Sequence, residues 1–208
     1  MKPYFIGVAG PSCAGKSYLA GRLAEKLGAA LLQLDSYYRE LDHLAPHQRA
    51  QYNFDKPDAL DSALLLAHAR QLYNGETIAR PVYDFATHTR TGETLPLVPK
   101  TYVIVEGLFA LYWESLRNLM GTKVFVDLGE EICLERRIMR DISERARTRE
   151  SVLEQYRATV LPMARQFVYP TRAHADLAVT GNDDISHEVE IVLRHVERGV
   201  AMSIEGVS

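Results

Sequence analysis

The feature that most constrains the fold is an eight-residue glycine loop near the N-terminus. Residues 10–17 have the sequence GPSCAGKS, which matches the pattern G-x-x-x-x-G-K-[ST]. An apolar run from Tyr4 to Ala9 precedes the loop, and apolar residues at helical spacing follow it from Ser17 to Leu27. Strand, glycine loop and helix in this order form a phosphate-binding site, because the loop N–H groups and the helix N-terminus attract anions. We therefore expect an α/β fold of the P-loop NTPase class.

The loop residues predict particular phosphate and metal contacts. Lys16 is expected to reach the β- and γ-phosphate oxygens, and Ser17 to bind Mg²⁺. The predicted ATP-binding residues of the loop are Gly10, Pro11, Ser12, Cys13, Ala14, Gly15, Lys16 and Ser17. The motif indicates a nucleotide but no particular reaction, since GTPases, motor ATPases and small-molecule kinases all contain it.

Further apolar runs complete the predicted sheet. Together with the first run they predict a doubly wound sheet of five parallel strands, because helical patterns lie between most of them. The four other predicted strands cover residues 30–34, 101–105, 124–128 and 177–179. Helices are predicted over 57–73, 130–142, 151–167 and 185–200. Residues 77–100 contain three prolines and Gly92, so they predict a β-hairpin or loop inserted outside the sheet.

Composition limits the class of protein. A chain of 208 residues with 47% hydrophobic content predicts one domain over residues 1–208. The net charge of −3 argues against a nucleic-acid partner. Cys13 and Cys133 are far apart, which fits a reducing compartment and supports neither disulfides nor a zinc site. The sequence has no pattern typical of a signal peptide or a membrane span, so we expect a cytoplasmic protein without membrane contact.

Two carboxylates follow predicted strands directly. Asp35 and Glu106 lie at strand ends, and ligands of open parallel sheets bind beyond the carboxyl ends of the strands. Phosphoryl transfer to an alcohol requires a carboxylate near the attacking hydroxyl and another near Mg²⁺. We assign Asp35 to the hydroxyl and Glu106 to the metal, and the predicted metal-binding set is Ser17, Glu106 and Asp35. The alternative is that each carboxylate caps the turn that follows its strand.

Several longer segments carry a resemblance to a known family. They are LDSYYR at 34–39, YNFDKPDA at 52–59, PVYDFATHTR at 81–90, EG at 106–107 and RRIMRDISERAR at 136–147. Over residues 4–180 the chain resembles the uridine kinases of the phosphoribulokinase/uridine kinase family. The resemblance implies Mg²⁺-dependent phosphorylation of the 5′-hydroxyl of uridine or cytidine by ATP or GTP. Members of the family are commonly homotetramers, so it also implies a homo-oligomer.

The resemblance implies roles for the substrate-binding residues. Asp35 corresponds to the residue beside the 5′-hydroxyl and Asp55 to the one that binds the ribose hydroxyls, so deoxynucleosides should be poor substrates. Tyr83 and His88 correspond to the residues that contact the base. The remaining implied nucleoside contacts are Phe54, Phe85, Arg137, Arg147 and Gln155. The alternative is that the aromatic residues belong to the core and that His88 is a surface histidine.

Arginines are dense over residues 136–150. We interpret this stretch as a lid, in which Arg140 and Arg145 stabilise charge on the transferred phosphoryl group and complete a catalytic set with Asp35 and Lys16. The alternative is a solvated helix face. Its acidic partners would be Glu131, Glu135, Asp141 and Glu144.

The chain departs from the family after the last predicted strand. Residues 179–184 are VTGNDD, where relatives often have Pro-Arg-Gly, and Asp184 is a candidate ATP contact. Two other functions remain open. One is a family kinase acting on ribulose phosphate or pantothenate, and the other is a nucleotide-binding regulatory module, which would need no sugar pocket.

Overall fold

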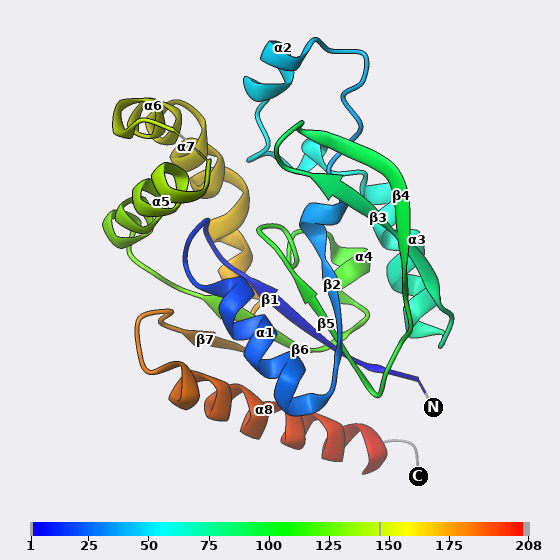
Figure 1. Ribbon diagram of the computed structural model, residues 1–208. Coiled ribbons are helices and arrows are strands. Elements are labelled where there is room, and N and C mark those ends of the chain that lie inside the picture. The colour runs from blue at the N-terminus through cyan, green and yellow to red at the C-terminus, as the bar shows by residue number, and fades with distance from the viewer. Residues whose placement is uncertain (1, 146, 206–208) are drawn as a thin grey trace.

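The computed structural model describes residues 2–145 and 147–205 (Figure 1). Met1, residues 206–208 and Ala146 of the predicted lid lie outside the described residues. The centre is a parallel sheet with the strand order β2-β5-β1-β6-β7, which confirms the predicted five-stranded sheet. Its strands are β1 (Tyr4–Ala9), β2 (Ala30–Gln33), β5 (Tyr102–Glu106), β6 (Met120–Val126) and β7 (Leu177–Val179). The register pairs Val8 with Glu106 and with Val124, so the carboxyl ends of the central strands lie together.

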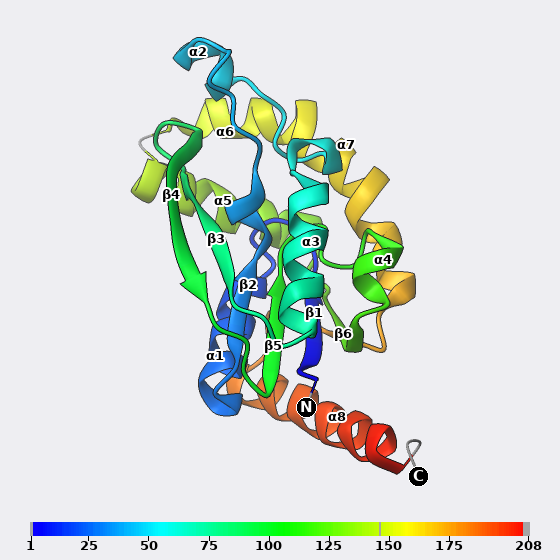
Figure 2. The ribbon, with the colours of Figure 1, turned by 90° about the vertical axis from the view of Figure 1, so that its right-hand side faces the viewer.

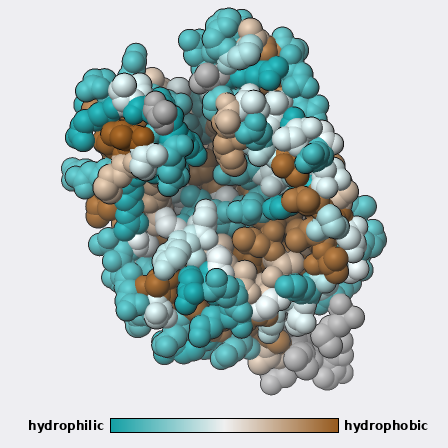
Figure 3. All heavy atoms as spheres, in the orientation of Figure 1, coloured by the Kyte–Doolittle hydropathy of each residue, from teal (hydrophilic) through white to brown (hydrophobic). Residues whose placement is uncertain are grey.

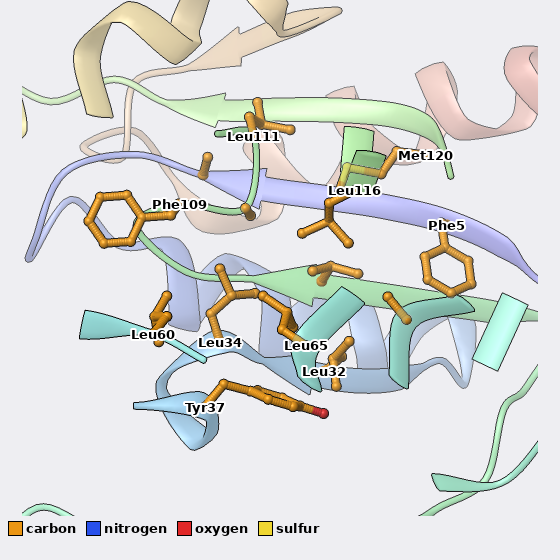
Figure 4. Close-up of a cluster of buried hydrophobic side chains, with 14 of the residues drawn as sticks. Phe5, Leu32, Leu34, Tyr37, Leu60, Leu65, Phe109, Leu111, Leu116 and Met120 are labelled. Carbon is orange, nitrogen blue, oxygen red and sulfur yellow. The ribbon is translucent and has the colours of Figure 1, made fainter. Parts of the chain in front are cut away.

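Helices cover both faces of the sheet. Helices α1 (Lys16–Leu27) and α8 (Ile185–Glu205) pack on one face through Leu23 and Val192. Helices α3 (Ser62–Tyr73) and α4 (Glu114–Arg117) cover the other face, as the two views of the ribbon show (Figures 1 and 2). Figure 4 shows this second cluster, where side chains from β1, β2, α3 and α4 converge. Burial on both faces is the reason that the strands are continuous apolar runs.

The inserted segment is an antiparallel hairpin outside the main sheet. It consists of β3 (Ile78–Asp84) and β4 (Thr89–Leu97), which confirms the hairpin prediction. Arg90 joins it to the body, because its guanidinium donates to the main-chain oxygens of Tyr37 and Tyr38 at 3.2 and 2.9 Å. A loop segment that includes α2 (Pro46–Ala50) extends beside the hairpin tip (Figure 1).

The predicted helix over 57–73 is wrong at its start. A 3-10 turn covers Pro57–Ala59, Leu60 is extended, and α3 begins only after Asp61, whose carboxylate accepts the Leu64 N–H at 3.1 Å. The helix starts late because contacts with a distant segment keep these residues extended. Leu60 forms a bridge with Tyr38, and the Asp61 N–H donates to the Tyr37 oxygen at 2.8 Å.

The arginine-dense stretch is helical. Helix α5 (Glu130–Arg145) is followed by α6 (Arg149–Gln155) and then by a helical run through α7 (Leu161–Met163) to Val168. Pro162 has no N–H to donate, and π-helical turns lie on either side of α7. Of the helices in residues 2–145 and 147–205, none combines the length and the apolar composition that crossing a bilayer requires.

Candidate active site

A cavity of about 1310 Å³ lies beyond the carboxyl ends of the central strands. In Figure 3 the surface is hollowed between the side formed by α5–α7 and the side formed by the hairpin. Most of the predicted site residues line this cavity. They are Ser12, Cys13, Gly15, Lys16, Ser17, Asp35, Phe54, Asp55, Tyr83, Phe85, His88, Glu106, Arg137, Arg140, Arg145, Arg147 and Gln155. The cavity thus joins the phosphate loop to the hairpin and the arginines.

The glycine loop has the conformation that anion binding requires. Gly15 has φ 106° and is the N-cap of α1, and it lines the cavity, so the N-terminus of this helix faces the space where phosphates would bind. Gly10 has φ 148°, and a Cβ there would lie 2.4 Å from the Val126 oxygen, so the loop is held tightly against β6. Lys16 is buried, and its Nζ donates to the Pro11 oxygen at 2.8 Å. The ammonium group is therefore held directly within the loop that would surround the phosphates.

Gly10, Pro11 and Ala14 support the loop from behind the cavity. None of the three is among the residues of the described chain that line it, and Ala14 is fully buried. Their predicted contact with ATP gains no support from these positions.

Two carboxylates face the loop. Glu106 ends β5, is buried, and accepts a hydrogen bond from the Ser17 hydroxyl at 3.0 Å. Burial raises the pKa of Glu106 above 4.5, against the opposing charge of Lys16. Asp35 lies on the 3-10 turn Leu34–Tyr37 after β2 and is accessible from the cavity. Desolvation raises its pKa above 3.8, although Lys16, Arg145 and Arg140 oppose the shift.

These groups suit a magnesium ion. Mg²⁺ takes oxygen ligands and is usually held by one or two carboxylates together with substrate phosphates. Ser17, Glu106 and Asp35 supply such oxygens at one end of the cavity, and the charge of Asp35 raises the pKa of Glu106, so the two carboxylates lie near each other. The residues present therefore fit the ion.

Aromatic side chains form the opposite side of the cavity. The His88 ring stacks on Phe54 at 5.4 Å between centroids, and Phe85 packs edge-on against Tyr83 at 5.1 Å. Burial, together with Arg145 and Arg147, lowers the pKa of His88 below 6.5 against the opposing charge of Asp84, which favours the neutral ring at pH 7. The Tyr83 hydroxyl is buried and has no hydrogen-bond partner among the described residues. A neutral ring and a free hydroxyl are suited to the polar edge of a base.

Asp55 lines the same cavity, within electrostatic reach of Arg137 and Arg140. Its carboxylate is half-buried, and burial raises its pKa above 3.8 while Arg137 and Arg140 oppose the shift. The charge of Asp35 raises the pKa of Asp55 further, so the two carboxylates lie within electrostatic reach in the same cavity.

The arginines of α5 are organised by hydrogen bonds. Arg137 donates to the Ser12 hydroxyl at 3.0 Å and to the Gln155 side chain at 3.1 Å, which links the helix to the glycine loop. Arg147 donates to the same Gln155 oxygen and to the Ser151 oxygen. The alternative of a solvated helix face with Asp141 as one of its acids is wrong for this side of α5, because Asp141 is fully buried.

The loop after β7 is attached to the cavity wall in a way that the sequence did not predict. Arg136 donates to the Gly181 oxygen at 2.8 Å, and buried Glu188 of α8 accepts the Gly181 N–H at 2.7 Å. Asp184 does not line the cavity, and its carboxylate accepts the Ser186 N–H at 2.7 Å at the start of α8. Its predicted contact with ATP gains no support from this position.

Residues that sequence reasoning missed also line the cavity. Tyr38 is buried between Tyr83 and Phe54, with ring centroids 5.3 and 5.2 Å away. Tyr38 lies within the LDSYYR segment, which carries the family resemblance, so the sequence could have indicated it as a site residue. Arg136 adjoins the predicted Arg137, but Glu188 had no local signal, because its partner is a main-chain group of another segment.

Gly181→Ala is expected to destabilise the protein by about 2 kcal/mol or more. The φ of Gly181 is +64°, and a Cβ would lie 2.2 Å from the Ala14 oxygen and 2.8 Å from Val126. The clash would displace the glycine loop, so thermal unfolding and ATP affinity should both be impaired. Gly21→Ala is the control, because it lies in α1 with nothing within 4 Å of its added methyl. Equal melting temperatures for the two variants would contradict this account.

Comparisons with known proteins all match this chain to one family of kinases. The model of the phosphoribulokinase / uridine kinase family matches residues 5–186. A uridine kinase of Macrococcus caseolyticus is 39% identical over 94% of this chain and 97% of its own length. A uridine kinase of Chloroflexus aurantiacus is 41% identical over 94% of this chain and 95% of its own.

A solved structure has the same fold. Phosphoribulokinase from Rhodobacter spheroides superposes with a TM-score of 0.63 over 88% of this chain and 73% of its own, at 16% identity. By its sequence, its five-stranded parallel sheet and its glycine loop, this chain belongs to the phosphoribulokinase / uridine kinase family.

Proposed function

We propose that this protein transfers the γ-phosphoryl group of ATP or GTP to the 5′-hydroxyl of uridine or cytidine. The observation that carries the proposal is that one cavity contains the P-loop lysine, a strand-end carboxylate and an aromatic site whose tyrosine hydroxyl has no partner within the described part of the chain. The curated relatives that match almost the whole chain are uridine kinases, which supports a nucleoside as the acceptor.

The glycine loop would bind the donor phosphates. Its N–H groups and Lys16 would surround the β- and γ-phosphates, and Arg140 and Arg145, which line the same cavity, would stabilise charge on the transferred group. Ser17 and Glu106, with Asp35, would hold Mg²⁺, which neutralises charge on the phosphate oxygens when it is bound.

Asp35 would accept the proton of the 5′-hydroxyl. As the 5′-oxygen bonds to the γ-phosphorus, the bond from that phosphorus to the oxygen bridging it to the β-phosphate breaks, and ADP leaves with that electron pair. Asp55 would accept hydrogen bonds from the ribose hydroxyls, while Phe54, Phe85 and Tyr38 enclose the base. Tyr83 and neutral His88 would contact its polar edge, and Arg137, Arg147 and Gln155 complete the predicted nucleoside contacts.

A substrate panel tests this proposal. The protein is incubated with Mg-ATP and uridine, cytidine, deoxyuridine, adenosine, ribulose 5-phosphate or pantothenate, and ADP release is followed. We expect turnover with uridine or cytidine and kcat/KM at least about 100-fold lower with deoxyuridine, because Asp55 would lose a partner. Turnover with only ribulose 5-phosphate or pantothenate would replace the proposed acceptor. An absence of ADP release with every acceptor would favour a regulatory module.

A further inference from the structure

Asp141 occupies an unusual position on α5. Its side chain is fully buried and does not line the cavity, yet the arginines around it do. Within the described chain, four arginines lie within ion-pair distance of this one carboxylate. The distances are 3.6 Å to Arg137 Nε, 2.7 Å to Arg140 Nη2, 3.8 Å to Arg145 Nε and 3.5 Å to Arg147 Nη1.

The contacts constrain orientation as well as charge. Arg140 donates through both Nε and Nη2 to Oδ1 of Asp141, at 2.9 and 2.7 Å, which fixes the plane of its guanidinium. The main chain is held too, because the Arg147 N–H donates to the Asp141 carbonyl oxygen at 3.1 Å. Asp141 is thus bonded to residues before and after the end of α5.

The electrostatic situation explains why a carboxylate is needed here. Four guanidinium groups facing one cavity repel one another, and a buried carboxylate among them offsets part of that repulsion. Its one negative charge leaves the cluster with an excess of positive charge for an anionic ligand. A neutral side chain at this position would leave the arginines more positive but without a common acceptor.

We propose that Asp141 is a positioning residue, which holds Arg140, Arg145 and Arg147 in the arrangement that stabilises the phosphoryl group during transfer. This inference rests on the proposed kinase function. A positioning role for Asp141 predicts opposite effects on ATP binding and on kcat. Loss of the carboxylate makes the site more positive, so binding of ATP is retained or strengthened. Loss of orientation removes stabilisation from the transition state, so kcat falls.

Asp141→Asn is the first test, with Glu135→Gln as the matched control. Glu135 is an exposed acid on the same helix, so its substitution changes the net charge equally without touching the cluster. For Asp141→Asn we expect kcat to fall about 30-fold, while calorimetry with Mg-ATP in the absence of nucleoside gives an unchanged or lower Kd and unchanged stoichiometry. A fall of less than tenfold, a weaker affinity, or a loss of binding sites equal to the loss of kcat would overturn the proposal.

Asp141→Glu covers the case in which the asparagine variant does not fold. Glutamate keeps the charge but moves the carboxylate by one methylene, so a positioning role predicts a kcat about tenfold below wild type with ATP binding retained. A role in charge balance alone predicts wild-type kcat, and that result would overturn the proposal.

Nuclear magnetic resonance separates this inference from the proposed function. The Arg140 Nε–H resonance, identified by its loss in Arg140→Lys, should be protected from exchange in the wild type and in Glu135→Gln, and unprotected in Asp141→Asn. If the wild type turns over no nucleoside, the proposed function fails, and this signal still tests Asp141. Equal protection in the wild type and in Asp141→Asn would exclude the positioning role.

Discussion

Asp35→Asn is expected to lower kcat for uridine about 10³-fold, which corresponds to about 4 kcal/mol of transition-state stabilisation. The amide cannot accept the proton of the 5′-hydroxyl, and it replaces one of the two carboxylates available to Mg²⁺ by a neutral group. Steady-state assays with saturating Mg-ATP measure the effect. Asp58→Asn is the control, because Asp58 is exposed and does not line the cavity. A variant with more than a tenth of wild-type kcat would exclude Asp35 as the base.

The same substitution has a pH signature. Desolvation among the groups of the cavity raises the pKa of Asp35 above 3.8 in the folded protein, although its side chain remains exposed to the cavity. Because the reaction needs the ionised form, kcat/KM of the wild type should fall on the acid side at a pH above that of an ordinary carboxyl, and this limb should be absent in Asp35→Asn.

Stability should change in the opposite direction to activity. A carboxyl whose pKa is raised on folding binds its proton more tightly in the folded state, so it destabilises the fold as pH rises through the folded pKa. Asp35→Asn removes this cost at pH 7, and its melting temperature should therefore equal or exceed that of the wild type. A lower melting temperature would show that Asp35 has a structural role.

Asp55→Ala is expected to lower kcat/KM for uridine about 10³-fold, because two ribose hydroxyls lose a charged acceptor worth about 1.5–3 kcal/mol for each bond. Deoxyuridine makes only one of these bonds, so it should lose less, and the preference for uridine should fall to within a few-fold. Parallel assays of both nucleosides in the wild type and the variant measure the change. KM for ATP serves as the internal control, since no hydrogen bond joins the Asp55 carboxylate to the glycine loop within the described residues.

Two results would contradict the assignment of Asp55. One is an unchanged preference for uridine over deoxyuridine, which would place the ribose hydroxyls elsewhere. The other is an equal loss for both nucleosides together with a lower melting temperature, which would indicate damage to the fold. Phe54 is its chain neighbour and packs against His88, so circular dichroism should accompany the assays.

Local sequence was sufficient where one short segment fixes both conformation and contacts. The glycine loop is defined by Gly10, Gly15 and Lys16, and the structure has the strand and helix that these residues predict on either side. The hairpin was predicted from the prolines and Gly92 of residues 77–100, although Pro81, Gly92 and Pro96 lie inside its strands rather than in its turn. Asp35 and Glu106 were placed at one end of the sheet because parallel strands carry their carboxyl ends to the same edge.

Other features depended on partners distant in sequence. The helix expected from residue 57 begins only at Ser62, because Leu60 pairs with Tyr38 and so stays extended. Asp141 has the sequence of an ordinary acid on a charged helix, and only packing of the arginines around it makes it buried. Asp184 was proposed from resemblance as an ATP contact, and in the structure its carboxylate accepts the Ser186 N–H just before α8.

The sequence by itself determined the phosphate loop, the parallel sheet and the family, because these depend on residue patterns within single segments. Only the tertiary structure showed that Tyr38 and Arg136 share the cavity and that Asp141 is buried among the arginines. Burial and ion pairing are set by groups that lie far apart in the chain, and the free energy of an ionised side chain depends on those neighbours rather than on its own segment.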